Sequence, residues 1–238
     1  MNTRFNPTCN GRLHLGHLYL VLLNYDAARS TGGRFIVRFD DDQLYWVNKL
    51  GRRAMEEFSA TVFDDLEWMG IDVDLYSSEA AERKANEGWL NDRLPLLEHG
   101  EDLGFPMPQI KTCDRPYPYV PYLTAVKVAQ DHREGCDLVI RGDDLVTEFS
   151  LYFYFCRILE ITPPAFQYVP KLTRSGEDLS DVSKTSGDLK VADFRNRGWT
   201  PAQVVELLAE SCLVDPAVGW RYDNVRLQPA IAEQRALV

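Results

Sequence analysis

The chain has 238 residues, a formal net charge of −10 and a hydrophobic share of 45%. A chain of this length can bury a sizeable core, and its acidic charge argues against non-specific nucleic-acid binding, which needs a basic surface. Its apolar stretches are too short to span a membrane, and we expect no signal peptide. The five cysteines form no Cys-x-x-Cys pair, so we expect reduced thiols, a cytoplasmic location and no zinc site.

The N-terminal stretch combines a short extended piece, ending near Gly11, with two histidines that stand three positions apart. A helix is predicted to begin directly on them, over residues 15–31. Residues three apart in the first helical turn lie on one face, so His14 and His17 can point at one object. The free backbone N–H groups of that turn favour an anion, and Gly16 leaves room for a bulky ligand. The pattern indicates a site for a polyphosphate nucleotide.

The histidine pair could also have a role unrelated to a nucleotide. On spacing alone, surface or core histidines are commoner than ligand-binding ones. A metal site is not favoured, because the chain has only four histidines and no third ligand stands at a useful spacing.

Strands and helices alternate along the rest of the chain. Strands are predicted over 34–39, 71–75, 138–140 and 166–172, and helices over 48–69, 79–99, 122–134, 145–161 and 201–212. This alternation predicts an α/β fold with a parallel sheet that is covered by helices on both faces. A proline-rich stretch from 100 to 121 breaks the pattern and is typical of a loop-like insertion. A short helical pattern over 227–237 has no assignable role.

Charged side chains follow the predicted strands at the edge where open α/β sheets bind ligands. The triplet Asp40–Asp42 follows strand 34–39, and by itself a solvated turn is its better explanation. Arg141 stands at the end of another strand, and Arg4 lies in the first extended piece. A guanidinium binds carboxylates with two parallel hydrogen bonds. An ordinary salt bridge is the alternative for each arginine, although an arginine at each of two strand ends near one crevice is less ordinary.

Four blocks resemble the class I aminoacyl-tRNA synthetases, in particular the glutamyl/glutaminyl branch. They are RFNPTCNGRLHLGH (4–17), RFDDD (38–42), DLVIRGDD (137–144) and LSDVSKTSGD (179–188). The resemblance covers about residues 3–212. It implies a Rossmann-like nucleotide-binding fold with a shortened connective insertion and a short C-terminal helical segment. The expected divisions are a first half over 1–75, the insertion over 76–121, a second half over 122–172, and a lysine loop with the helical segment over 173–238.

The resemblance also implies a role for each matched residue. His14, His17 and Lys184 are the expected catalytic residues, the lysine acting on the departing pyrophosphate. The expected substrate-binding residues are Arg4, Asn6, Thr8, Asp40, Leu123, Lys127 and Arg141. The expected ATP-binding residues are Gly16, Asp143 and Ser183. ATP is expected with Mg²⁺, and the protein itself is expected to supply no metal site.

Several of these positions depart from the family pattern. Asp40 stands where the family has a glutamate that takes the substrate's α-amino group, and it is one methylene shorter. Leu123 and Lys127 stand where the family has a tyrosine and an asparagine, so the pocket loses a hydroxyl and gains a cation, which should alter selectivity. Asp181 replaces the first lysine of the phosphate loop, and we expect it to point away from the triphosphate. A rival register over 178–181 would remove both lysines.

The sequence therefore predicts a core-only relative of the glutamyl-tRNA synthetases, similar in extent to the truncated glutamyl-queuosine tRNA synthetases. It would activate an amino acid, with glutamate or a similar acidic one favoured, as an aminoacyl-adenylate and transfer it to tRNA. The expected partners are ATP, the amino acid and a tRNA acceptor end. Two alternatives stay open: a tRNA-independent amino-acid ligase, and a non-catalytic paralogue that binds ATP or an amino acid. The amino acid and the oligomeric state stay open as well.

Overall fold

A five-stranded parallel sheet forms the centre of the molecule, with strand order β3-β2-β1-β4-β5. The computed structural model describes residues 1–93, 119–142, 145, 149–169, 173–174, 177–178 and 189–211. The strands are β1 (Thr3–Phe5), β2 (Phe35–Phe39), β3 (Leu75–Ser78), β4 (Leu138–Gly142) and β5 (Ala165–Val169). A separate antiparallel pair is formed by β6 (Thr173–Arg174) and β7 (Glu177–Asp178).

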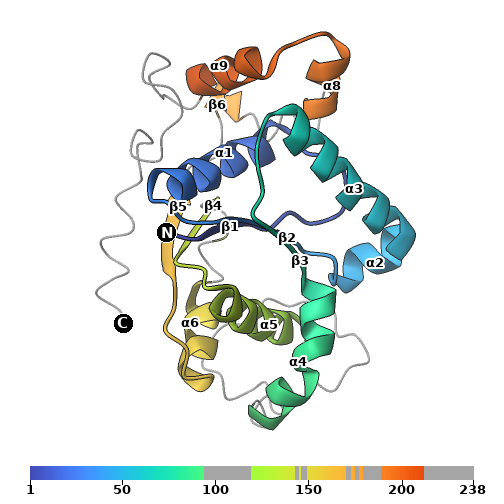
Figure 1. Cartoon of the computed structure of the whole chain (residues 1–238). Coiled ribbons are helices and arrows are strands. Elements are labelled where there is room, and N and C mark those ends of the chain that lie inside the picture. The colour runs from blue at the N-terminus through green and yellow to red at the C-terminus, as the bar shows by residue number, and fades with distance from the viewer. Residues whose placement is uncertain are drawn as a thin grey trace.

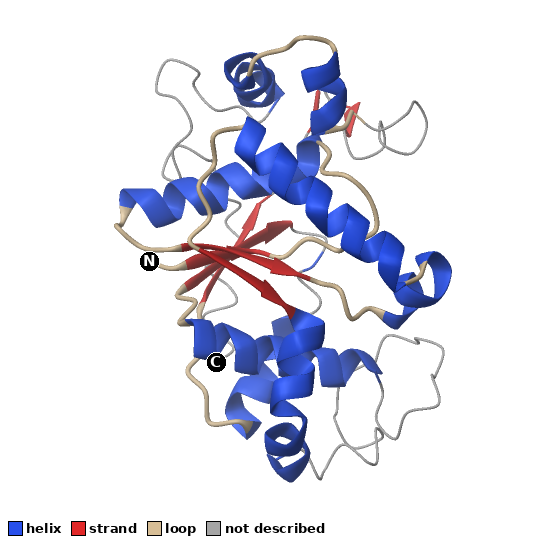
Figure 2. Ribbon diagram, turned by 45° about the vertical axis from the view of Figure 1, so that its right-hand side comes forward, coloured by secondary structure: helices blue, strands red, loops and turns tan. Residues whose placement is uncertain are grey.

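Helices cover both faces of this sheet, as the sequence predicted (Figures 1 and 2). They are α1 (Leu15–Ser30), α2 (Leu44–Leu50), α3 (Arg52–Trp68), α4 (Glu79–Arg93), α5 (Tyr119–Glu134), α6 (Phe149–Ile158), α8 (Val191–Asn196) and α9 (Pro201–Ser211). α1 and α3 lie on one face, with α8 and α9 outside them, and α4, α5 and α6 lie on the other. Each face has its own cluster of buried apolar side chains, which is the arrangement that a parallel sheet requires.

The order of the strands reverses between β1 and β4. Thr3 pairs with Phe35 of β2 on one side and with Leu138 of β4 on the other. The chain first builds outward to β3 and then returns to add β4 and β5 on the opposite side. In such sheets the ligand crevice lies outside the carboxyl ends of the strands at this switch point. The loop after β1, which leads into α1, therefore lies at the edge where the site was expected.

The structure corrects three element boundaries. The helix predicted over 48–69 is two helices, α2 and α3, because Gly51 has a φ of 84°, which a helix does not allow and which favours glycine. The strand predicted over 71–75 begins only at Leu75. The strand predicted over 166–172 begins at Ala165, and its last three residues lie outside the described part. The short helix α8 was not anticipated.

The segment after residue 75 belongs in part to the layered fold. β3 pairs with β2 along its whole length, and α4 packs on α5 through the fully buried Leu90. The boundary predicted between the first half of the fold and the insertion, at residues 75 and 76, therefore lies within β3, after its first residue. Residues 94–118 of the expected insertion lie outside the described residues, as do 212–238. In the described part of the chain no helix is long and apolar enough to cross a membrane.

Candidate active site

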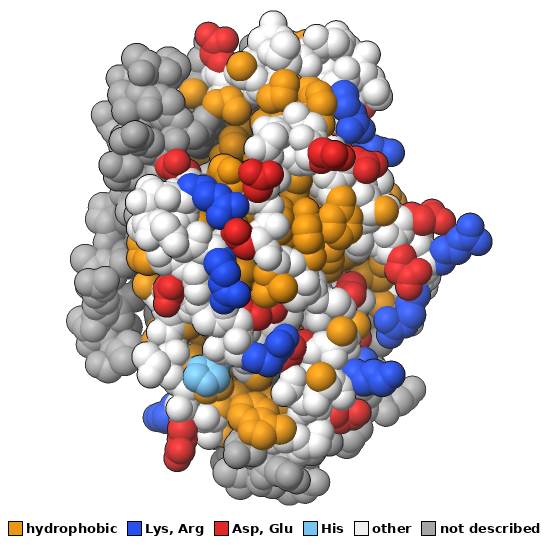
Figure 3. Space-filling model, in the orientation of Figure 1, with side chains coloured by type: hydrophobic (Ala, Val, Ile, Leu, Met, Phe, Trp, Pro, Cys, Tyr) orange, Lys and Arg blue, Asp and Glu red, His pale blue; other side chains and the backbone are white. Residues whose placement is uncertain are grey.

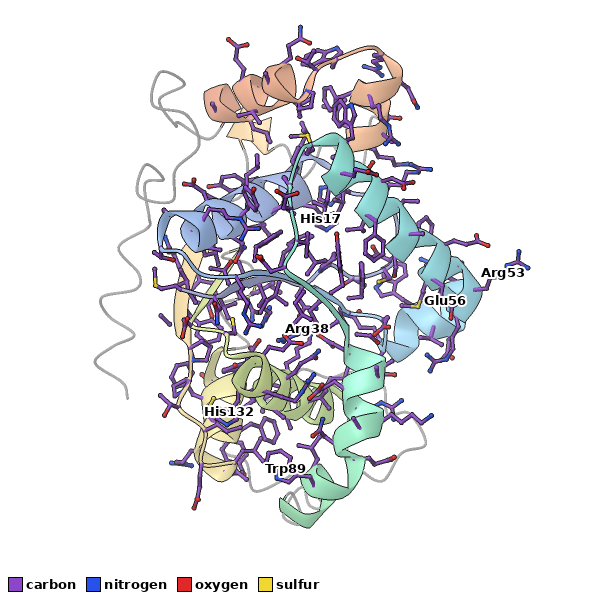
Figure 4. The ribbon with its side chains drawn as sticks, viewed as in Figure 1. His17, Arg38, Arg53, Glu56, Trp89 and His132 are labelled. Atoms are coloured by element: carbon purple, nitrogen blue, oxygen red, sulfur yellow. The ribbon has the colours of Figure 1, made fainter. Side chains whose placement is uncertain are left out.

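The two histidines of the N-terminal motif lie against each other at the start of α1. Their ring centroids are 3.8 Å apart and their planes are 25° from parallel. His14 is the residue before the helix, and its Nδ1 accepts the backbone N–H of Gly16 at 3.1 Å. Figure 4 shows His17 at this end of α1, above the sheet. The structure thus brings together both histidines that the sequence singled out.

Gly16 lies close to the His14 ring, a contact that the sequence did not show. A Cβ atom at this position would lie 3.1 Å from His14 Cε1, so the imidazole would have to shift by a few tenths of an ångström. The first turn is also less open to an anion than predicted. The N–H of Leu15 already donates to the carbonyl of Leu189 at 3.2 Å, and that of Gly16 to His14.

His17 is an uncharged imidazole at physiological pH. Burial, helped by the neighbouring His14, lowers the pKa of His17 to about 3. Its Nδ1 is buried and has no hydrogen-bond partner among the described residues. A neutral imidazole can donate one N–H to a phosphate oxygen without carrying a full charge.

A segment far along the sequence is fixed beside the histidines. The N–H of Val191 donates to the carbonyl of Leu13 at 2.9 Å, and together with the bond between Leu15 and Leu189 this makes a short antiparallel bridge. α8, which begins at Val191, is further held to α3 by an ion pair between Arg195 and Asp65, 3.8 Å apart. The chain that follows the predicted lysine loop is therefore anchored at the start of α1.

Three predicted site residues lie outside the described part of the chain. They are Asp143, Ser183 and Lys184, and Asp181 lies there too. Their roles stay predictions.

Two of the three clustered aspartates support the fold. Asp41 accepts hydrogen bonds from the Ser78 hydroxyl at 2.6 Å and from the backbone N–H of Ala80 at 2.9 Å, and so caps the start of α4. Asp42 is fully buried and forms an ion pair with Arg83 of α4. Both carboxylates tie the end of β2 to the start of α4.

Asp40 instead belongs to a cluster with residues that were predicted to bind substrate. It accepts the Thr8 hydroxyl at 3.3 Å and a hydrogen bond from Gln43. The Lys127 Nζ lies 3.7 Å from its Oδ2 and 3.8 Å from Oε1 of Glu79. Burial, with the nearby charge of Asp40, raises the pKa of Glu79 to about 8, although Lys127 acts in the opposite direction. Glu79 was not predicted from the sequence, because the preceding strand was expected to end at residue 75. The structure places Glu79 directly after β3, at the start of α4.

Arg4 lies in the salt bridge that the sequence allowed as its alternative. Its side chain is 7% exposed, and its Nε lies 2.7 Å from Oδ1 of Asp131. Its second nitrogen donates to Oδ2 of the same carboxylate at 3.2 Å. Asp131 also pairs with Arg38 at 2.7 Å and accepts the Tyr152 hydroxyl at 2.7 Å. Figure 4 shows Arg38 between the sheet and α5. The guanidinium group of Arg4 is thus engaged in a salt bridge within the protein in this structure.

The other predicted substrate residues lie on the surrounding elements. Arg141, in β4, donates to the carbonyl of Leu145 at 2.9 Å, and its guanidinium carbon lies 5.8 Å from the ring centroid of Tyr168. Asn6 donates to the Arg38 carbonyl at 3.0 Å and so links the loop after β1 to β2. Leu123 is buried in α5.

A groove of about 600 Å³ runs beside the edge strand β3. It is lined by Phe39, Tyr76, Ser77, Ser78, Ala81, Glu82, Ala85, Asn86 and Arg133. None of the predicted site residues lines it. Apolar side chains are exposed on the face seen in Figure 3. In the described residues no group of three His, Cys, Asp or Glu side chains is placed to hold a metal ion.

Solved structures with the same fold include aminoacyl-tRNA synthetases. The glutamate-tRNA synthetase of Elizabethkingia anophelis superposes with a TM-score of 0.65 at 15% identity, over 98% of this chain and 69% of that one. The tyrosyl-tRNA synthetase of Archaeoglobus fulgidus superposes with a TM-score of 0.60 at 16% identity, over 87% of this chain and 64% of that one. The chain thus shares the fold of these aminoacyl-tRNA synthetases.

The sequence comparisons point to the glutamyl/glutaminyl branch of the class I synthetases. The family model described as "tRNA synthetases class I (E and Q), catalytic domain" matches residues 1–88. Glutamate–tRNA ligase 2 of Cereibacter sphaeroides is 25% identical over 87% of this chain, and glutamate–tRNA ligase 1 of Novosphingobium aromaticivorans is 27% identical over 90%. Residues 1–88 are similar to the catalytic domain of class I synthetases of the glutamyl/glutaminyl type, which confirms the resemblance seen in the sequence.

The chain is shorter than these relatives. It spans 60% of the Cereibacter protein and 61% of the Novosphingobium protein. The alignment with the Cereibacter protein runs over 273 positions, more than the 238 residues of this chain, so that relative has segments that this chain lacks.

Proposed function

We propose that the protein activates an amino acid with ATP as an aminoacyl-adenylate and transfers it to tRNA. Glutamate or a similar acidic amino acid is the favoured substrate, since the relatives are named glutamate–tRNA ligases. The observation that carries the proposal is the stacked pair His14 and His17 at the start of α1, beside the strand-order switch and clamped by residues 189–191.

The reaction is an in-line displacement at phosphorus. A carboxylate oxygen of the amino acid forms a bond to the α-phosphorus of ATP, and the bond to the bridging oxygen of pyrophosphate breaks with its electron pair. Catalysis of such a step rests on positioning and on stabilising charge. The neutral His17 and its neighbour His14 would donate hydrogen bonds to the phosphate oxygens. ATP would enter as its Mg²⁺ complex, and Lys184 would neutralise the departing pyrophosphate.

The amino acid would bind beside the histidines, between the ends of β1, β2 and β4. Asp40 would take the ammonium group, with Thr8 and Asn6 on the same side of the site. Arg141 would hold a carboxylate, which its planar guanidinium suits. Arg4 would act on the substrate only if its bond to Asp131 opened, so we assign it a structural part.

ATP–pyrophosphate exchange across the twenty amino acids tests this function. We expect exchange with one acidic amino acid, and a loss of at least about 100-fold in His14→Ala and in Lys184→Ala, the scale seen when a group that stabilises transition-state charge is removed. Arg53→Ala is the control, since the side chain of Arg53 is 92% exposed. Unchanged exchange in both active-site variants, or none in the wild type, would refute the proposal.

An amino-acid ligase that works without tRNA is the second candidate. The shortened insertion expected over residues 76–121 favours it, and the relative from Cereibacter sphaeroides has aligned segments that this chain lacks. Running each assay with and without bulk tRNA, and following transfer of the labelled amino acid, separates the two functions. The cytoplasmic location stays a prediction from the sequence.

A further inference from the structure

Lys127 lies between two buried carboxyl groups that compete for its single charge. Its Nζ is 3.7 Å from Asp40 Oδ2 and 3.8 Å from Glu79 Oε1. Both distances are longer than a good hydrogen bond, and they are nearly equal, so neither carboxyl group has the ammonium to itself.

The cluster is short of one positive charge. Asp40 Oδ1 and both oxygens of Glu79 are buried, and the hydrogen bond that acts on Glu79 comes from the pairing with Asp40 itself. Arg38, which also acts on Glu79, is paired with Asp131 and Glu134. Lys127 therefore has to compensate two buried carboxyl groups, and ionising both of them carries a high desolvation cost. Burial and the charge of Asp40 raise the pKa of Glu79 to about 8. At neutral pH Glu79 therefore keeps its proton, while Asp40 pairs with Lys127.

Of the three groups, Lys127 alone is substantially exposed. Its side chain is 24% exposed, against 4% for Asp40 and 0% for Glu79. A ligand ammonium that pairs with Asp40 competes with the Lys127 ammonium, which is the exposed member of the cluster. Lys127 then needs another anion, and Glu79 is the carboxyl group already within 3.8 Å.

We propose that Glu79 is a positioning residue that receives Lys127 when a substrate ammonium displaces it from Asp40, and that Glu79 gives up its proton in this exchange. The inference rests on the proposed function and deepens it. Before binding, the charges are Asp40⁻, Lys127⁺ and a neutral Glu79. After binding, Asp40⁻ holds the substrate ammonium, Lys127⁺ pairs with Glu79⁻, and one proton has left to solvent. The cluster is neutral in both states.

Calorimetry counts this proton directly. The full chain is titrated at pH 7 with the amino acid that supports exchange, in two buffers of different ionisation enthalpy. We expect release of about one proton per bound amino acid in the wild type, as linkage requires for a group that is mostly protonated beforehand. The matching acid without the amine, glutarate in the case of glutamate, should bind without proton release, because it has no ammonium to displace Lys127.

Two variants test the residues separately. Glu79→Gln leaves Lys127 without a second anion, so we expect the KM for the amino acid to rise about tenfold with kcat little changed, the pattern of lost substrate binding. Lys127→Met removes the need for exchange, so proton release should disappear while binding persists. Glu87→Gln, an exposed carboxyl group on the same helix, is the control and should behave as the wild type.

The pH profile of KM provides a readout that a merely structural residue would not change. The charged groups facing Glu79 are Asp40 and Arg38 from β2 and its end, and Lys127 from α5. The wild-type KM should fall as the pH rises toward 8, and the profile should be flat in Glu79→Gln. Exchange without proton release, or equal KM profiles in the wild type and Glu79→Gln, would overturn the inference and leave the proposed function standing. No exchange with any amino acid would overturn both.

Discussion

Two clusters of charged side chains lie within the same fold, and they are built in opposite ways. In the scaffold cluster, Arg4 and Arg38 meet Asp131 at 2.7 Å each, and Arg38 also pairs with Glu134. In the crevice cluster, one lysine is shared between two carboxyl groups at 3.7 and 3.8 Å.

The difference shows which charged groups are paired within the protein and which are available to a ligand. Burial alone would raise the pKa of Asp131, but Arg38 and Arg4 lower it well below its usual range. The pKa of Glu79 moves the other way, because one lysine cannot compensate two buried carboxyl groups. A compensated cluster stabilises the folded state, whereas an under-compensated one can still bind a cation.

Removing the central carboxylate of the scaffold cluster should have the largest effect on stability. Asp131→Asn leaves two buried guanidinium groups short of an anion, so we expect a loss of about 3–5 kcal/mol in the free energy of unfolding. Urea unfolding measures it. Glu57→Gln, in an exposed ion pair with Arg53, should change it by less than about 0.5 kcal/mol. Equal losses in the two variants would contradict the comparison.

Arg4 tests the comparison further. The family resemblance implies that Arg4 binds substrate, whereas in the structure it pairs with Asp131 of the scaffold cluster. Arg4→Met removes two charge-assisted hydrogen bonds, but leaves Asp131 paired with Arg38. We expect a loss of about 2–3 kcal/mol in unfolding free energy, with the KM for the amino acid unchanged. A raised KM with unchanged stability would return Arg4 to the substrate site.

His17 should make the protein sensitive to acid. Its pKa is about 3 in the folded state, against 6.5 for the ordinary group. Below pH 6.5 the unfolded chain therefore gains a proton that the folded chain refuses, and stability falls with falling pH. We expect thermal melts of His17→Asn to lose less stability between pH 6.5 and 4 than the wild type does. His132→Asn, at an exposed position on α5, is the control, and an identical wild-type and His17→Asn profile would argue against a buried neutral imidazole.

At pH 5 the smallest effect on stability is expected in the crevice cluster. The pKa of Glu79 is raised from 4.5 to about 8 in the folded state, so stability is lost as the pH rises between these values. Glu79→Gln should match the wild type within about 1 kcal/mol at pH 5 and exceed it at pH 8.5. Thermal melts at the two pH values test this, and a variant that is less stable at pH 8.5 would show that the cluster is already compensated.

The sequence determined the features that depend on near neighbours along the chain. The alternation of apolar strands and helices predicted the parallel sheet with helices on both faces, since burial on both faces leaves a strong apolar pattern. The spacing of His14 and His17 predicted that they share the first turn of a helix, because helical geometry is local. Gly51, which separates α2 from α3, is present in the sequence, but the helical spacing of apolar residues continues across it, so a single helix was predicted.

Only the tertiary structure decided how the charges are shared. Arg4 meets Asp131 from 127 positions away, and Lys127 meets Glu79 only because β3 and α5 come together beside the end of β2. A carboxylate has the same sequence pattern whether it caps a helix, as Asp41 does, or faces a shared lysine, as Asp40 does. Coulomb interactions depend on distance and on burial, and neither quantity exists for these pairs until the chain has folded.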